Sequence, residues 1–432
     1  MADAADAARR THTENASTDV KAATPSDPPG SAAGMARLPL LDAIRGMALL
    51  GVLLINLRSL SLYDFLAADE RLQLPTAAFD AVLLAWMNAL YDGTAFTLFT
   101  LLFGIGFSIQ LNATNERADP QRVSRYVRRL LILLGIGLLH GLIWWGDILR
   151  YYAVLGLLLI PLRRWSARSL TLLGLAVILV SPMLLRAWLV PLLPPTMDSR
   201  TSAQLAAEAF ASTDPATWLS GNLERDLYMR IAVWMLPTYV FGRLILGLAL
   251  GRTGALLNPR QHLRLWRRLC WIGAVGAAVL SLLLWWRGLA LAGSEPGWWR
   301  SSTGAALARI CRAGFPLALG MAYLAAFVLL FQRTSWRRWL VLLAAPGRMA
   351  LTLYLLQTVF GIALFYGVGL GLGTRPGLAG ILAIGLLAFG LQTMLSHWWL
   401  GRYRQGPMEW IWRALTWGRR PPFRRQNADS HH

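Results

Sequence analysis

The sequence predicts an all-α fold, a polytopic membrane protein with about ten transmembrane helices. Apolar residues make up 56% of the 432 positions and charged residues only 15%, whereas soluble domains are about a quarter charged. Several apolar segments, such as residues 170–190, have the roughly 20 residues needed to cross a hydrocarbon core about 30 Å thick. The segments are continuous and do not alternate with polar residues, so they do not fit the strands of a membrane β-barrel.

The net charge of +20 is explained by membrane topology, and we expect no nucleic-acid partner. Alternate loops differ sharply in their number of Lys and Arg residues, with 23 in one set of loops and 8 in the other. The rich set comprises 112–129, 163–168, 252–268, 332–338 and 401–425, and the poor set 58–76, 146–150, 191–228, 287–303 and 371–376. Because cytoplasmic loops carry the positive charge, we expect a bacterial inner-membrane protein with both termini in the cytoplasm, surrounded by membrane lipids.

The elements follow in order along the chain. Residues 1–36 are rich in Ala, Ser, Thr, Pro and Asp without the apolar core of a signal peptide, which predicts a disordered cytoplasmic tail. The transmembrane helical domain is expected over 37–402. Its predicted crossings are 38–57, 96–111, 128–145, 149–162, 169–190, 229–251, 269–290, 305–331, 347–368 and 377–399.

Three segments do not fit a simple crossing. Residues 79–93 are short and polar, which favours a re-entrant or interfacial helix; a full crossing there would place the N-terminal tail outside. Residues 191–228 form the largest periplasmic loop. Residues 403–420 have the pattern of an amphipathic helix on the cytoplasmic face, and 421–432 are expected to be a disordered tail.

The first crossing contains a charged pair that needs a partner or a task, because a charge within the bilayer costs about 2.5–3.5 kcal/mol on insertion scales. Asp42 and Arg45 are three residues apart and share one helical face. They either form an ion pair with each other, or Arg45 faces a cavity and an anionic cofactor, with Gly46 allowing close approach. Asn56, near the outer end, has two interpretations as well: a hydrogen bond between helices or a substrate contact.

The stretch LLHGLIWWGDILRYY (138–152) contains the strongest candidate for chemistry. His140 is placed about 18 Å into its helix, and it is the one histidine well inside a predicted crossing. Asp147, two turns further on, could orient the ring, and histidine is the commonest general base. A structural hydrogen bond between helices is the alternative. Trp144 and Trp145 are expected at the outer interface as anchors, with Trp144 also a candidate substrate contact.

Arginines near the cytoplasmic helix ends form a second candidate site. Arg348 follows a Pro-Gly break, and Arg243 belongs to another crossing. Such side chains either extend to the headgroups, or Arg45, Arg348 and Arg243 converge on phosphates, which guanidinium groups bind well. Gln357 is a further candidate substrate contact. The sequence has no Cys/His cluster that predicts a metal site.

Several motifs together resemble the YeiB-like family of bacterial inner-membrane proteins, a domain-of-unknown-function group. They include LLDAIRGMALLGVLLINL, RRLLILLGIGLLHGLIWWGDILRYYAVLGLLL, GRMALTLYLLQ and YRQGPMEWIWRALTWGRR, and the resemblance covers about 37–420. More distantly, Asp42, Arg45 and Gly46 resemble the DxxRG pattern of the transmembrane acyltransferase superfamily. Those enzymes carry an acyl group from cytosolic acyl-CoA to a sugar hydroxyl or amine across the membrane. They also place a histidine near the end of the first crossing, where this sequence has Asn56 and no histidine.

The leading hypothesis is therefore an acyltransferase that moves an acyl group, expected to be acetyl, from cytosolic acyl-CoA to a periplasmic glycan or lipid acceptor. Arg45, Arg348 and Arg243 would hold the CoA, and His140, oriented by Asp147, would deprotonate the acceptor. The alternatives are a transporter or lipid-handling protein with His140 and Asp147 as a proton relay, and a non-enzymatic envelope assembly factor. The sequence identifies neither the acyl donor and acceptor nor the oligomeric state.

Overall fold

The computed structural model describes residues 38–91, 93–111, 121–193, 197–292 and 297–425. The tail expected at residues 1–36 lies outside these ranges, as do residues 426–432. The described residues form helices joined by short connections, with one isolated β-bridge between Tyr403 and Arg424. The all-α class is therefore confirmed.

The first half of the chain contains ten α-helices in its described part. They are α1 Pro39–Leu60, α2 Ala68–Leu72, α3 Ala77–Leu90, α4 Thr94–Gln110, α5 Arg122–Ile143, α6 Leu149–Leu157, α7 Ala167–Leu179, α8 Ser181–Leu189, α9 Ser199–Ala211 and α10 Pro215–Ala232.

The second half adds eight α-helices over its described residues. They are α11 Leu236–Arg252, α12 Leu263–Ala292, α13 Ser302–Phe331, α14 Thr334–Leu340, α15 Ala344–Arg348, α16 Ala350–Phe365, α17 Gly377–Arg402 and α18 Pro407–Trp417. Short 3-10 helices join them at Tyr63–Phe65, Pro161–Arg164, Val190–Leu192, Pro259–His262, Gly297–Arg300 and Val341–Leu343.

Seven helical segments of the described chain are long and apolar enough to cross a membrane, or up to nine if each of two bent pairs counts as one crossing. One bent pair is α10 with α11 at 72°, and the other joins Thr334–Arg348 to α16 at 77°. The nine segments correspond to nine of the ten expected crossings. The tenth, 149–162, differs: it forms α6, which has nine residues and at about 1.5 Å per residue is too short to cross alone.

The segment 79–93 contributes α3, which runs into α4 so that the two together make one candidate crossing. Asp80 within it is buried and accepts hydrogen bonds from the backbone N–H groups of Leu378 and Ala379, at 2.8 and 2.9 Å. These groups are at the start of α17, where helical N–H groups lack partners within the helix. The polar character of the segment therefore has a structural cause.

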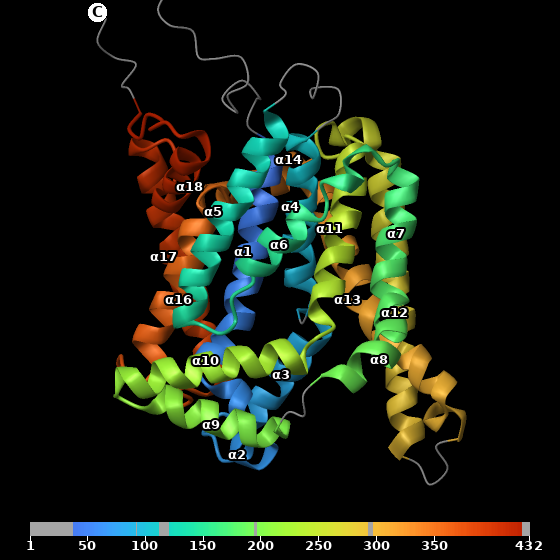
Figure 1. Cartoon of the computed structure of the whole chain (residues 1–432), viewed down its shortest axis with the longest axis vertical. Helices are drawn as coiled ribbons and strands as arrows, with labels where there is room; N and C mark the ends of the chain where they lie inside the picture. Colours follow the sequence, from blue (N-terminus) through green and yellow to red (C-terminus); the bar gives the residue numbers. More distant parts are fainter. Residues whose placement is uncertain (1–37, 92, 112–120, 194–196, 293–296, 426–432) are drawn as a thin grey trace, which may run out of the picture. The chain divides into compact units, whose positions relative to one another are not determined.

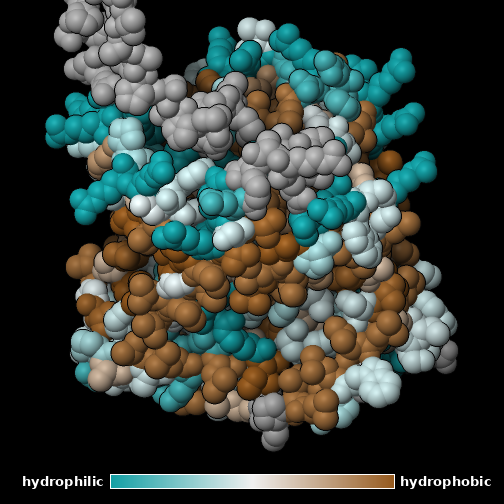
Figure 2. Space-filling model, turned by 45° about the horizontal axis from the view of Figure 1, so that its top comes forward, coloured by the Kyte–Doolittle hydropathy of each residue, from teal (hydrophilic) through white to brown (hydrophobic). Residues whose placement is uncertain are grey.

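The arginine-rich connections gather at one end of the helical unit, which we call the arginine-rich end (Figure 1). The starts of α1, α5 and α12, together with α14 and α18, lie there, while α2, α9 and α10 lie at the opposite end, the hairpin end. Figure 2 shows hydrophilic residues concentrated at the arginine-rich end above a broad hydrophobic band. The spatial alternation of the loops is the one that the charge count predicted.

Two sequence expectations are corrected by this fold. The segment 191–228 contains the helical hairpin of α9 and α10, and both helices begin at an aspartate cap: Asp198 accepts from the N–H groups of Arg200 and Thr201, and Asp214 does the same for α10. Helix caps of this kind are readable in a sequence. Residues 421–425, expected to be part of a disordered tail, instead pair with the end of α17: Arg404 N–H donates to the carbonyl of Phe423, whose ring contacts Tyr403.

Helix α1 is the centre of the packing. It contacts α4, α15, α16 and α17, and Leu49, Leu53 and Leu57 on it are fully buried. By contrast, α12 leaves much of its apolar surface exposed, including Trp271, Ile272 and Trp285, as expected of a helix that faces lipid. Every functional side chain described below is positioned by α1 or by a helix close to it.

Candidate functional site

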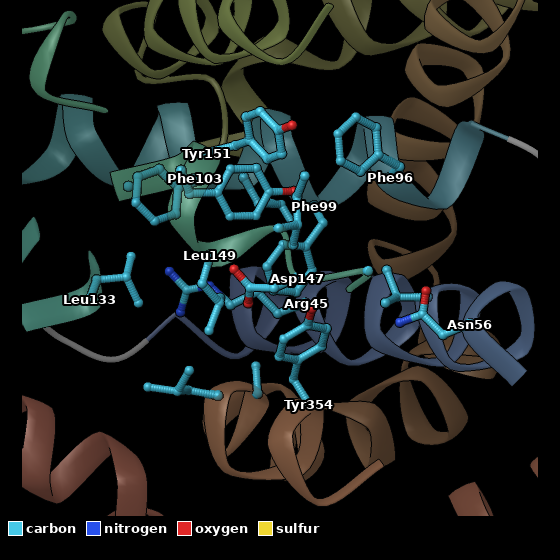
Figure 3. Close-up of a pocket in the computed structure, with 18 of the residues that line it drawn as sticks. Arg45, Asn56, Phe96, Phe99, Phe103, Leu133, Asp147, Leu149, Tyr151 and Tyr354 are labelled. Atoms are coloured by element: carbon cyan, nitrogen blue, oxygen red, sulfur yellow. The ribbon is translucent and has the colours of Figure 1, made fainter. Parts of the chain in front are cut away.

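A cavity of about 560 Å³ runs along α1. Arg45 and Asn56, both on α1, line it (Figure 3) and are eleven residues or about 16 Å apart along the helix. Phe96, Phe99 and Phe103 of α4 face α1 across the cavity. The cavity therefore joins a cationic end to a polar end through an aromatic middle.

The cationic end is built from three arginines on three helices. Arg45 of α1, Arg129 of α5 and Arg348 of α15 all line the cavity. Arg45 is paired with Asp42 at 3.0 Å, which confirms the expected ion pair, while Arg348 donates to the backbone carbonyl of Arg404 at 3.0 Å. Two of these three arginines, Arg45 and Arg348, were predicted from the sequence to lie together.

Two glycines explain why Arg45 and Arg348 meet. A Cβ atom on Gly46 would lie 2.0 Å from the carbonyl oxygen of Leu343, and one on Gly347 would lie 1.8 Å from that of Asp42. Only glycine allows the backbones of α1 and α15 to approach so closely. The glycine after Arg45 and the glycine before Arg348 thus bring the two guanidinium groups to one cavity.

Arg129 was missed by the sequence analysis, where it counted only as one of the positive charges of a cytoplasmic loop. Its guanidinium donates to the side-chain oxygen of Gln110 at 3.1 Å and lies 4.1 Å from the ring of Trp412. Trp412 in turn donates its indole N–H to the carbonyl of Arg129 at 2.8 Å. The amphipathic helix α18 therefore holds one wall of the cationic end in place.

The acidic residue at this end, Glu409 of α18, has a structural task. Its carboxylate accepts the backbone N–H groups of Leu351 and Thr352 at 2.7 and 3.1 Å, and the Thr352 hydroxyl at 2.5 Å. It therefore caps the start of α16. Burial raises the pKa of Glu409, opposed by its hydrogen bonds from Thr352 and Leu351.

At the other end, the predicted pair of His140 and Asp147 forms. The Nδ1 atom of His140 lies 2.7 Å from Oδ2 of Asp147, and Nε2 lies 3.0 Å from the hydroxyl of Thr358. The contact does not come from a continuing helix, because α5 ends at Ile143 and a turn carries Asp147 back to the ring. Since an ionised carboxylate only accepts, Nδ1 donates to Asp147, and in a neutral ring Nε2 accepts from Thr358.

The ring itself does not face the cavity, contrary to expectation. His140 is buried and is absent from the cavity wall, whereas Asp147 is part of that wall. Trp144 and Tyr354 pack against the ring with centroid distances of 5.7 and 5.1 Å. Both ring nitrogens are occupied, so His140 is placed to hold Asp147 and not to touch a bound molecule.

Asp147 belongs to a network of charges that reaches the hairpin end. Its Oδ1 accepts from Nε of Arg150 at 3.1 Å. Arg150 then binds Asp226 of α10 with two nitrogens, at 2.9 and 3.0 Å, and Arg230 binds the same carboxylate. Two carboxylates and two guanidinium groups balance, which suits charges at low exposure in a membrane protein.

Asn222 fastens α10 to the same turn. Its side chain, fully buried, donates to the carbonyls of Gly141 and Leu142 and accepts from Trp145 N–H, all within 2.7 to 3.0 Å. Asn222 and Asp226 were missed because they lie in a segment interpreted as a loop. The aspartate caps of α9 and α10 were the signal that could have placed them on a helix.

The remaining predicted residues divide between the cavity and its surroundings. Asn56 lines the cavity and has no hydrogen-bond partner within the described chain. Trp144 also lines it, but the indole is buried, so its expected position as an interfacial anchor is wrong. Gln357 is buried and donates to Gln392 at 3.0 Å, away from the cavity wall. Arg243 does not join Arg45 and Arg348, and it is buried elsewhere.

The cavity wall also contains polar atoms without partners. Tyr126 and Trp144 are buried side chains of the wall, and Oη of the tyrosine and Nε1 of the tryptophan have no hydrogen-bond partner among the described residues. A buried donor without an acceptor costs free energy. The wall is thus suited to a molecule with acceptor atoms along its length.

Fold and site together define a class: an α-helical membrane protein with an internal cavity between a cationic end and a polar end. The comparisons with known proteins agree with the family predicted from the motifs. Residues 250–419 match the model of a family described as Protein of unknown function (DUF418). This region runs from α11 to α18 and includes Arg348 and Trp412.

The chain is similar over most of its length to proteins that carry no functional name. It is 29% identical to Uncharacterized protein YxaH of Bacillus subtilis (88% of this chain, 94% of the relative) and 29% identical to Uncharacterized protein YeiB of Escherichia coli (88% and 97%). An uncharacterized 39.9 kDa protein of Bacillus acidopullulyticus is 26% identical (90% and 96%). No solved structure matches the chain significantly. The chain is therefore similar to YeiB over most of its length, and residues 250–419 match a domain of unknown function.

Proposed function

We propose that this protein is an acyltransferase that takes an acyl group from cytosolic acyl-CoA and passes it to a hydroxyl- or amine-bearing glycan or lipid at the periplasmic side. One observation carries the proposal: a single cavity joins Arg45, Arg129 and Arg348 to Asn56 and Asp147. Three guanidinium groups suit the phosphates of CoA. An elongated donor lying along α1 would then present its thioester near the polar end.

The chemistry assigns Asp147 the role first expected of His140. The acceptor oxygen or nitrogen attacks the thioester carbonyl, the C–S bond breaks, and the CoA thiolate leaves. The proton lost by the acceptor passes to Asp147, which lines the cavity, and from there to the thiolate. His140 fixes the carboxylate by its 2.7 Å hydrogen bond, as a positioning residue. Asn56, with a free amide, can hold the acceptor or the thioester oxygen.

Two observations favour this function over the alternatives. The unpartnered donors of Tyr126 and Trp144 suit a chain with amide carbonyls, such as the pantetheine arm, better than a hydrocarbon tail. The network beyond Asp147 continues through Arg150, and arginine does not release its proton in proteins. This network therefore does not suit a proton path from His140 to the hairpin end.

The test uses the full-length protein in sealed vesicles. Radiolabelled acetyl-CoA is supplied on the side of the membrane that the arginine-rich end faces, and extracted envelope glycans and lipids serve as acceptors. We expect label to appear in an acceptor. Asp147→Asn should reduce transfer by about 10²-fold or more, the contribution typical of a general base. Arg129→Gln should mainly weaken the apparent affinity for acyl-CoA. The matched control is Asp214→Asn, an exposed aspartate that caps α10.

The proposal fails if no acceptor is labelled by the wild-type protein. It also fails if Asp147→Asn, shown to be folded by its thermal unfolding, transfers as fast as Asp214→Asn.

A further inference from the structure

Arg243 is a buried cation without a counter-charge in the described chain. It lies near the middle of α11 and is 4% exposed. Its Nε has no hydrogen-bond partner, and no carboxylate of the described residues forms an ion pair with it. The titratable groups that interact with it electrostatically are the phenols of Tyr152 and Tyr239. Arg150, whose side chain is 14% exposed, by contrast binds two aspartates.

An unpaired guanidinium at membrane depth is costly, so such residues mark functional positions. Aromatic rings compensate part of the charge: the guanidinium carbon lies 5.7 Å from the ring centre of Phe96 and 5.8 Å from that of Tyr239. Cation–π contacts of this length replace only some of the lost hydration. The site lacks an anion.

Phe96 places this cation next to the cavity. The ring of Phe96 lines the cavity on one side and contacts Arg243 on the other. Tyr152, which also lines the cavity, interacts electrostatically with the same guanidinium and holds its hydroxyl 3.0 Å from that of Thr100. A rotation of the Phe96 side chain would open a direct path from Arg243 to a bound molecule.

The position of Phe96 along the cavity indicates which part of a bound molecule Arg243 would contact. Figure 3 shows Phe96 in the half of the cavity that contains Asn56, while Phe103 and Leu133 lie toward the other half. With the phosphates of a donor at Arg45, Arg129 and Arg348, the acyl end of the donor reaches the half with Phe96. The anion that Arg243 lacks therefore belongs to the acyl group.

We propose that Arg243 binds a carboxylate on the transferred acyl group, so that the preferred donor carries a dicarboxylic acyl such as succinyl. This inference rests on the proposed function, since it names the donor class of the same cavity. It also accounts for a cation that neither the phosphate end nor the network of Asp147 uses. A monocarboxylic acyl such as acetyl would leave the guanidinium unpaired.

The test compares CoA, acetyl-CoA and succinyl-CoA as ligands of the full-length protein in detergent, read out by thermal unfolding and equilibrium binding. We expect succinyl-CoA to bind wild type about tenfold more tightly than acetyl-CoA, the gain typical of one charge-assisted hydrogen bond. Arg243→Gln and Arg243→Met should lose this preference and keep their affinity for acetyl-CoA. Without ligand, Arg243→Met should unfold at a higher temperature than wild type, because an uncompensated cation has been removed.

The matched control is Arg252→Gln, which removes the arginine at the C-terminal end of the same helix and should keep the succinyl preference. Equal binding of the two acyl-CoAs by wild type, or a preference that survives in both Arg243 variants, overturns the inference and leaves the acyltransferase proposal standing. Absence of binding by CoA and by both acyl-CoAs overturns both.

Discussion

At the residue scale, the sealed position of His140 changes its role from base to support. Its ring is held by Asp147 and Thr358 and is covered by Trp144 and Tyr354. Of the pair predicted from the sequence, only Asp147 reaches the cavity. An imidazole with both nitrogens occupied fixes the orientation of its partner, as carboxylate–histidine pairs do in many sites.

Thr358→Val tests this supporting role. The substitution keeps the shape of the side chain but leaves Nε2 of His140 buried without a partner. We expect the free energy of unfolding to fall by about 1–3 kcal/mol, the cost of one unsatisfied buried polar group. Acyl transfer should fall less than in Asp147→Asn, because Asp147 still faces the cavity.

The measurement is thermal and denaturant unfolding in detergent, together with the vesicle assay. A Thr358→Val protein as inactive as Asp147→Asn, yet as stable as wild type, would instead indicate that Thr358 takes part directly in the reaction.

At the element scale, the site depends on a close contact between α1 and α15. The DxxRG pattern is usually considered for its arginine, but the glycine after it lets the carbonyl of Leu343 approach α1. The contact is reciprocal, since Gly347 receives the carbonyl of Asp42 in the same way. Helix packing and the proposed binding of acyl-CoA therefore depend on the same two short segments.

Gly347→Ala should separate these two helices. The new methyl group would lie 1.8 Å from a backbone oxygen, and backbone cannot move aside as a side chain can. We expect a loss of about 1–3 kcal/mol in stability from overpacking and weaker binding of acyl-CoA, because Arg348 moves away from Arg45. Thermal unfolding and CoA binding measure the two effects.

Gly390→Ala is the matched control, since a Cβ on this residue of α17 meets nothing within 4 Å. It should be neutral or stabilise the protein by up to about 1 kcal/mol, as alanine does in a helix. If Gly347→Ala is as stable as Gly390→Ala, the close contact is not required for the fold.

At the scale of the whole molecule, the loops that the charge count assigned to one side of the membrane also lie at one end of the fold. The arginine-rich connections lie at one end of the helical unit and the α9–α10 hairpin at the other (Figure 1). By the positive-inside rule, we expect the arginine-rich end to face the cytoplasm. In the proposed function, this orientation would place Arg45 where cytosolic acyl-CoA arrives and Asn56 toward the periplasm.

Single cysteines test the orientation. The two native cysteines, Cys270 and Cys311, are unpaired thiols and would be replaced first. In intact spheroplasts, Thr213→Cys in the hairpin should react with a membrane-impermeant maleimide, and Gln261→Cys between α11 and α12 should react only after permeabilisation. Both residues are exposed. The reverse pattern of labelling would contradict the orientation and with it the direction of acyl transfer.

The sequence by itself determined the membrane class, the approximate crossings and the end at which arginines gather, because hydropathy and charge are averages over neighbouring residues. It also identified Arg45, Arg348, His140 and Asp147, since a charged or titratable group at membrane depth is rare enough to be noticed. Nine of the ten expected crossings have a matching helical segment in the described chain.

Tertiary structure alone decided which of these groups meet. It brought Asp226 into contact with Arg150, and Asn222 into contact with the turn after α5, from a segment interpreted as a loop. It also turned His140 away from the cavity and left Arg243 apart from the other arginines. The physical reason is that a hydrogen bond or an ion pair depends on a distance of about 3 Å between residues far apart in the chain. No periodicity or composition of a single segment contains that distance.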